Sequence, residues 1–189
     1  MSGALTGDDG RSRCPWGDGP PIYRAYHDTE WGVVLHGRDA LFERLCLEAF
    51  QAGLSWITVL RKREGFRAAF AGFEVEAVAA FGPADVQRLM ADAGIVRNAA
   101  KIDAAIGNAR VVADLEDLDA LLWSFAPTGP RRRPATTDDV PAITVESTAM
   151  ATDLKRRGFR FVGPTTAHAL MQATGMVDDH LAGCWRAGR

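Results

Sequence analysis

Several features that would place this chain in other classes of protein are missing from its sequence. No apolar run reaches the roughly 18 residues needed to span a bilayer. Residues 1–13 are rich in Gly and Asp and lack an apolar stretch, so they do not predict a secretory signal. The chain has only 3 cysteines, an odd number that argues against a disulfide framework. We therefore expect a cytoplasmic protein that does not contact a membrane.

An excess of positive charge is missing as well. The formal net charge is -2 at pH 7, so the chain lacks the global basic signature of many nucleic-acid-binding proteins. Three local basic runs, at residues 61–63, 131–133 and 155–157, are candidates for DNA contacts or ordinary solvated helix ends and loops. A length of 189 residues with 47% hydrophobic residues suits one compact soluble domain or two small lobes.

Strand patterns are scarce, and the periodicity of the apolar residues predicts an all-α fold. Asp39 is a plausible N-cap of the first clear helix, and Gly53 a plausible stop. Residues 126–140 are rich in Pro, Thr and Arg and predict an exposed connection, and residues 1–12 predict a disordered tail. The predicted helices span residues 39–52, 55–62, 67–71, 75–81, 83–92, 99–115, 118–125, 147–157 and 165–174.

One cysteine and one histidine near each end of the chain form a symmetrical set of metal ligands. Cys14 and His27 occur in the N-terminal part, and His180 and Cys184 follow an H-x3-C spacing near the C-terminus. Structural zinc sites use four nitrogen and sulfur ligands, so these residues predict a zinc ion that joins the two ends. The alternative is a core cysteine and a surface histidine. Cys46 occurs in an apolar helical run and is expected in the core.

Glu48 lies on the apolar face of the predicted helix 39–52. A carboxylate there is unfavourable unless it forms hydrogen bonds or faces a polar ligand. Gln51 follows one turn later and Trp56 soon after, so the three can form a floor with two hydrogen-bonding groups and one stacking ring. Together with the aromatic N-terminal segment, this indicates a pocket for a flat ligand. In the alternative, Glu48 binds the N-terminus of another helix in the core.

Residues 83–92 and 99–115 predict two helices joined by a tight turn that contains Gly94 and Ile95. This is the pattern of a helix-hairpin-helix, which directs backbone N–H groups toward a DNA phosphate without reading the base sequence. The usual hairpin has a second glycine two positions after the first, and Val96 occupies that place here. An ordinary corner between two helices is the alternative.

Four segments together resemble the DNA-3-methyladenine glycosylase I family, the constitutive bacterial enzymes of the helix-hairpin-helix superfamily. The resemblance extends from about Arg13 to Cys184, nearly the whole chain, and is therefore more specific than any single motif. The segments are residues 23–32 (YRAYHDTEWG), 51–60 (QAGLSWITVL), 92–95 (DAGI) and 157–163 (RGFRFVG).

The resemblance implies a helix-hairpin-helix glycosylase fold and a base-excision repair enzyme. Such an enzyme hydrolyses the N-glycosidic bond of 3-methyladenine in alkylated double-stranded DNA, releases the free base and leaves an abasic site, without a lyase step. The family's single structural zinc ion would be held by Cys14, His27, His180 and Cys184. The base pocket would combine the catalytic carboxylate of Glu48 with Trp16, Tyr23, Tyr26, Trp31, Gln51 and Trp56. The DNA-backbone contacts would come from Gly94, Ile95, Arg97 and Lys101.

We further expect a monomer with two lobes. Residues 13–57 and 135–189 would form the zinc-bearing lobe, and residues 58–134 the helix-hairpin-helix lobe. Two other classes remain open, a zinc-stapled DNA- or nucleotide-binding module without catalysis and a structural helical protein whose aromatic residues form its core. Other members of the superfamily place a catalytic Asp after the hairpin. The acidic residues there in this chain indicate a solvated helix face, and a catalytic role is assigned to none of them; they are Asp114, Glu116, Asp117 and Asp119.

Overall fold

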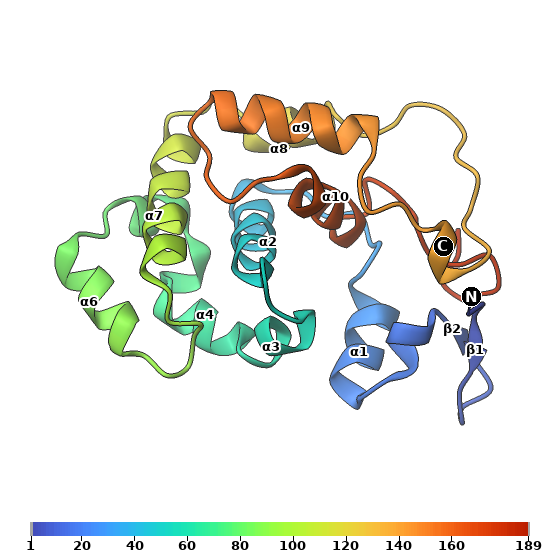
Figure 1. Ribbon diagram of the computed structural model, residues 1–189. Helices are drawn as coiled ribbons and strands as arrows, with labels where there is room; N and C mark the ends of the chain where they lie inside the picture. Colours follow the sequence, from blue (N-terminus) through green and yellow to red (C-terminus); the bar gives the residue numbers. More distant parts are fainter. Residues whose placement is uncertain (1, 189) are drawn as a thin grey trace.

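The computed structural model describes residues 2–188, so Met1 and Arg189, the outermost residues of the ranges predicted above, lie outside it. Helices dominate, which confirms the all-α class (Figure 1). The α-helices are α1 (Pro21–Thr29), α2 (Arg38–Gln51), α3 (Trp56–Arg61), α4 (Arg63–Ala69), α5 (Val75–Ala79), α6 (Pro83–Ala91), α7 (Ala99–Ala113), α8 (Leu118–Trp123), α9 (Val145–Arg156) and α10 (Pro164–Ala173). The remaining elements are β1 (Leu5–Thr6), β2 (Ser12–Arg13) and the 3-10 turns η1 (Pro15–Asp18), η2 (Ala71–Phe73) and η3 (Thr137–Asp139).

The predicted helices all form, with ends shifted by a few residues. The predicted cap of α2 is wrong, because Gly37 is the N-cap and Asp39 lies in the first turn. There its carboxylate faces the positive end of the helix dipole. Gly53 does follow the end of α2 with a φ of 78°, a conformation that is strained for other residues.

The N-terminal part is more ordered than its composition suggests, and the prediction of a disordered tail over residues 1–12 is corrected. Strands β1 and β2 form an antiparallel pair in which Leu5 lies opposite Arg13. A helix that was not predicted, α1, forms over residues 21–29, with Pro21 in its first turn. Charged residues of this segment hold it in place through ion pairs described below.

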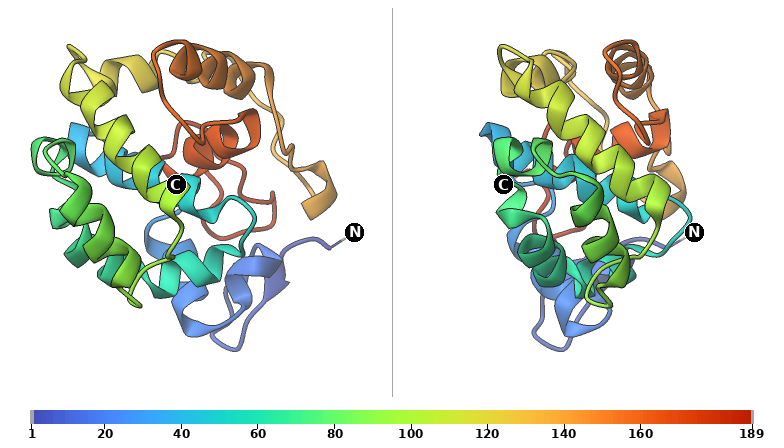
Figure 2. Two further views of the ribbon diagram at one scale, coloured as in Figure 1. Left: turned by 60° about the vertical axis from the view of Figure 1, so that its left-hand side comes forward. Right: turned by 90° about the vertical axis from the view of Figure 1, so that its left-hand side faces the viewer.

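Helix α2 lies in the interior and packs against α3, α5, α7, α8 and α10 (Figure 1). In the views of Figures 1 and 2, α10 lies between α9 and α1. One hydrophobic cluster extends from α2 to the segment after α10, with a second, small cluster around Cys14, Leu181 and Cys184. Because the larger cluster crosses the boundaries of the two predicted lobes, these share a core.

A backbone hydrogen bond joins the two ends of the chain, with Trp185 N donating to Ser12 O at 2.8 Å. Ala182 N donates to Pro134 O at 2.8 Å, which joins the C-terminal segment to the connection over residues 126–140. The connection over residues 126–140 is mostly exposed as predicted, but it also carries η3. None of the helices within residues 2–188 combines the length and the apolar character that a membrane span requires.

Candidate active site and metal centre

A cavity of about 340 Å³ lies between η1, α1, α2, α3 and α10. Three helices each contribute two residues spaced by three positions, a spacing that puts both side chains on one helical face. These pairs are Tyr23 and Tyr26 of α1, Glu48 and Gln51 of α2, and Ala169 and Gln172 of α10; Trp16, Trp31 and Trp56 complete the lining. The cavity therefore collects Glu48 and all six predicted base-binding residues.

This cavity is called the base pocket below. Within it, the ring of Trp16 packs edge to face against two other aromatic rings. Trp16 meets Tyr23 with ring centroids 5.8 Å apart and Trp31 with centroids 5.1 Å apart, both nearly perpendicular. The Tyr23 hydroxyl oxygen accepts a hydrogen bond from Ile57 N at 2.9 Å. This bond satisfies a free N–H in the first turn of α3 and thereby holds neighbouring Trp56 at the pocket wall.

Glu48 is the buried acid of the base pocket. Its residue is 5% exposed, and no residue in the described part of the chain forms a hydrogen bond with its carboxyl group. Burial raises the pKa of Glu48 to about 8, with Arg44 acting weakly in the opposite direction. The alternative, in which Glu48 binds the N-terminus of a helix, does not occur here. Its carboxyl group is instead available to a ligand in the pocket.

A partly buried ion-pair cluster lies beside the pocket. Glu30 accepts hydrogen bonds from Arg44 Nη2 at 2.7 Å and from Arg63 Nη1 at 2.5 Å. The guanidinium of Arg44 lies over the ring of Tyr26, 5.4 Å from its centroid. Burial opposes the ionisation of Glu30, but the bonds to both arginines outweigh it and lower its pKa. The cluster thus holds a lining ring in place and puts a cation near Glu48.

Three of the four predicted metal ligands form a compact buried group. The ligand atoms of Cys14, His27 and Cys184 all lie within 4.8 Å of one another, and His27 Nε2 is 3.4 Å from Cys184 Sγ. The neighbouring Cys14 thiol lowers the pKa of Cys184 to about 4, and Cys184, together with burial, raises the pKa of Cys14. This buried Cys-His-Cys group can bind a metal ion.

The fourth predicted ligand, His180, lies beside this group. Its ring centroid is 5.1 Å from that of His27, and its Nδ1 is 2.9 Å from Asp178 Oδ1. His180 Nε2 is buried and has no hydrogen-bond partner, the state expected of a nitrogen that faces a metal position. A Cβ atom on Gly32 would lie 2.6 Å from His180 Cε1, so only glycine permits this close approach.

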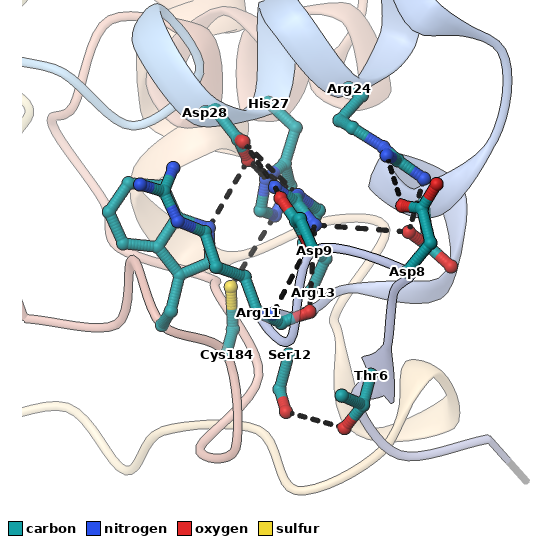
Figure 3. A network of polar contacts seen from close by, with 12 residues as sticks. Thr6, Asp8, Asp9, Arg11, Ser12, Arg13, Arg24, His27, Asp28 and Cys184 are labelled. Carbon is teal, nitrogen blue, oxygen red and sulfur yellow. Dashed lines mark hydrogen bonds and ion pairs between the residues drawn. The ribbon is translucent and has the colours of Figure 1, made fainter.

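An aspartate orients each of the two histidines through its Nδ1 atom. His27 Nδ1 lies 2.9 Å from Asp28 Oδ1, which leaves Nε2 for the cysteine group (Figure 3). Asp28 also binds Arg13, whose Nη2 is 2.7 Å from Asp28 Oδ2 and 2.6 Å from Asp9 Oδ2. Burial opposes ionisation of Asp28, but the bonds from Arg13 and His27 lower its pKa to about 2. Histidine ligands of metals commonly have such carboxylate partners.

Helices α6 and α7 form the predicted pair around the turn at residues 92–98. Asp92 Oδ1 accepts a hydrogen bond from Gly94 N at 2.7 Å, and Asn98 Oδ1 caps α7 by accepting one from Lys101 N at 3.2 Å. Ile95 is buried and anchors the turn in the core. Arg97 is exposed, and its guanidinium has no partner within residues 2–188.

The predicted phosphate contact of Lys101 is corrected by the structure. Its Nζ donates to Phe50 O at 2.8 Å and to Ala52 O at 2.5 Å, and the residue is 7% exposed. The ammonium group therefore satisfies free carbonyl groups at the C-terminus of α2, on either side of Gln51. Burial lowers the pKa of Lys101. Its side chain connects the hairpin helix to the pocket floor and is not available to a phosphate.

Sequence reasoning missed Ala169 and Gln172 of the base pocket and the aspartates behind the histidines. Ala169 and Gln172 occur in a correctly predicted helix, but no feature of the sequence marked which face would meet the pocket. Asp28 and Asp178 each lie within two positions of a predicted metal ligand, and that proximity was the one available signal.

Comparisons with known proteins all indicate the same family. The model of the methyladenine glycosylase family matches residues 16–187. The DNA-3-methyladenine glycosylase 1 of Escherichia coli is 49% identical over 177 residues, which cover 91% of this chain and 95% of that protein. The DNA-3-methyladenine glycosylase of Haemophilus influenzae is 41% identical over 182 residues, which cover 92% of this chain and 96% of that protein.

Solved structures agree. A crystal structure of 3-methyladenine DNA glycosylase I superimposes with a TM-score of 0.89 at 46% identity and covers 93% of this chain and 99% of that one. A structure of the enzyme from Staphylococcus aureus, solved to show how it recognises 3-methyladenine, gives a TM-score of 0.87 at 34% identity. The match covers 94% of this chain and 97% of that one. By sequence and by structure, this chain belongs to the methyladenine glycosylase family.

Proposed function

We propose that the chain removes 3-methyladenine from alkylated double-stranded DNA by hydrolysing the N-glycosidic bond, and thereby leaves an abasic site. The observation that carries this proposal is the base pocket, where a buried carboxyl group without a protein partner lies among five aromatic side chains. The relatives that share this fold over nearly their whole length carry the same activity in their names. Of the functions left open by the sequence, a structural protein explains poorly why Glu48 lies in a cavity.

The chemistry of the lesion suits this pocket. 3-Methyladenine is cationic while attached to deoxyribose, so its glycosidic bond is already weak and needs little activation. Aromatic faces attract a cation, and the Glu48 carboxylate can accept a hydrogen bond from the exocyclic amine. Reaching the pocket requires the base to leave the stack, which costs less for a damaged base.

Water is the proposed nucleophile, and no lyase step is expected. A lyase needs a free amine that can attack the sugar, and the ammonium of Lys101 is held by two backbone carbonyl groups. The acidic residues after the hairpin line no part of the base pocket. Catalysis therefore depends on binding the cationic base and on the charge of Glu48.

We further propose zinc as the ion held by Cys14, His27, His180 and Cys184, one per chain. Two thiols and two imidazoles form a donor set that zinc prefers, and four protein ligands leave no open position for chemistry. The unpaired Nε2 of buried His180 supports this assignment. The ion would join the two ends of a monomeric chain, in the proposed lobe formed by residues 13–57 and 135–189.

The hairpin between α6 and α7 is the proposed contact with the DNA backbone, through backbone groups near Gly94 and Ile95 and the side chain of Arg97. Arg97→Ala should weaken binding to any duplex and reduce the slope of log K against log salt by about 1, because one phosphate contact is lost. The measurement is a salt titration of duplex binding. Arg38→Ala, at the exposed start of α2 and outside the three basic runs, is the matched control, and an equal effect of both variants would contradict the assignment.

Chromatography of the bases released from methylated DNA tests the main proposal. Release of 3-methyladenine that depends on the protein is expected. If the folded, metal-loaded protein binds DNA but releases no base, the chain is a binding module, and the proposed activity is wrong.

A further inference from the structure

Gln172 is the polar residue of the base pocket for which neither the sequence nor the mechanism above gives a role. It lies on α10, one turn after Ala169, and its backbone carbonyl accepts a hydrogen bond from Gly32 N at 3.0 Å. That bond anchors the residue beside the segment that carries Trp31. Its side chain lines both the base pocket and a neighbouring cavity of about 230 Å³ that also contains Asp179.

The amide of Gln172 has a defined orientation. Its Nε2 donates to Asp179 Oδ2 at 3.0 Å. The same carboxylate lies 3.0 Å from His168 Nε2 and pairs with Arg131 at 3.3 Å. An ionised carboxylate only accepts hydrogen bonds, so the opposite orientation of the amide would place two oxygens against each other. Buried Asp179 therefore keeps the nitrogen on its own side.

The carbonyl oxygen of Gln172 must then point away from Asp179. Because Asp179 lines the neighbouring cavity and not the base pocket, the oxygen is on the side of the base pocket. No residue in the described range 2–188 donates a hydrogen bond to Gln172 Oε1. The acceptors that the base pocket presents without a donor thus include Gln172 Oε1 and the carboxyl group of Glu48.

We propose that Gln172 is a specificity-determining residue whose Oε1 accepts a hydrogen bond from the exocyclic amine of the methylated base. This inference rests on the proposed function. An adenine amine has two hydrogens and can serve both acceptors, whereas a guanine carries a carbonyl oxygen at the same position. An acceptor that faces that oxygen is left unpaired after losing its water, so 3-methylguanine binds less well.

Free-base binding to the full-length, metal-loaded protein tests the proposal, with 3-methyladenine and 3-methylguanine as probes. Gln172→Met removes the amide at nearly constant volume and should weaken 3-methyladenine binding about five- to tenfold. Binding of 3-methylguanine should change less, so that the ratio of the two dissociation constants falls. Gln87→Met, on exposed α6, is the matched control and should leave both constants unchanged.

A change in the ratio separates recognition from packing. If Gln172→Met weakens both bases equally, or neither, Gln172 only supports the wall and the inference is overturned. Gln172→Leu provides a second apolar replacement if the methionine variant does not fold, and equal melting temperatures establish that the comparison is valid. A wild-type protein that neither binds nor releases 3-methyladenine would contradict the proposed function instead.

Discussion

Replacing Glu48 by Gln should reduce the release of 3-methyladenine from methylated DNA by about a hundredfold or more, while making the folded protein more stable. Loss of one group aimed at charge in a buried site typically has an effect on rate of about this size. The variant keeps an oxygen that can accept from the exocyclic amine. A bound cationic base favours the ionised form of Glu48, whereas Gln cannot ionise to face that cation. Activity should therefore fall more than DNA affinity.

The gain in stability follows from the raised pKa of Glu48. The folded value of about 8 lies above the ordinary value of 4.5, so between these pH values the folded state holds a proton that the unfolded state releases. Stability from this group is present below pH 4.5 and is lost as the pH rises toward 8. At pH 7 the free energy of unfolding is therefore about 3 kcal/mol lower than it would be if Glu48 stayed protonated in both states. Gln does not ionise, so the variant does not lose this stability.

Thermal unfolding at pH 5 and pH 8 measures this effect. The melting temperature of Glu48→Gln should exceed that of the wild type by several degrees at pH 8 and by less at pH 5. Glu43→Gln on the same helix is the matched control, since Glu43 is paired with Arg67 at 2.9 Å and does not line the base pocket. That variant should keep base release. A Glu48→Gln protein that retains full activity would remove Glu48 from the mechanism.

Replacing Cys184 by Ser should lower the free energy of unfolding by about 4 kcal/mol or more and abolish binding of one zinc ion per chain. Cys184 belongs to the buried group with Cys14 and His27, and the free energy of metal binding at such a site contributes directly to folding. The second hydrophobic cluster is small, so apolar packing contributes little to holding the two ends of the chain together. The measurements are elemental analysis and chemical denaturation.

Cys46→Ser is the matched control, because Cys46 is equally buried but lies in the main core away from the metal group. It places an unpaired hydroxyl in an apolar site and should cost about 1–3 kcal/mol while leaving the zinc content unchanged. A chelator should lower the free energy of unfolding of the wild type to that of Cys184→Ser. It should not change the stability of Cys184→Ser itself. Unchanged stability of metal-free protein would show that the ends do not need the ion.

The main helices and most of the base pocket could be predicted because their signals are local or shared with the family. Apolar periodicity marked α2, α7 and α10, and Glu48 was conspicuous as an acid on an apolar face. Helix α1 and the β1–β2 pair escaped prediction because they depend on partners distant in sequence. The guanidinium of Arg13, for example, is buried against Asp28, which lies 15 positions further along the chain, as well as against nearby Asp9.

Lys101 illustrates a different kind of error. Its position in the hairpin suggested a phosphate contact, but the direction of its side chain depends on where the C-terminus of α2 lies. An exposed lysine gains little from one more contact with solvent, whereas free carbonyl groups at a buried helix end require a donor. The partners that satisfy such groups can be identified only after the helices are packed.

The sequence by itself determined the all-α class, the four candidate metal ligands and the residue types of a pocket for a flat ligand, because periodicity and residue chemistry are properties of short segments. Only the tertiary structure decided that Gln172 joins that pocket, that Asp28 and Asp178 orient the histidines, and that Lys101 turns inward. These outcomes depend on contacts between residues far apart in sequence, 51 positions in the case of Lys101 and Phe50, whose strength comes from burial and mutual orientation.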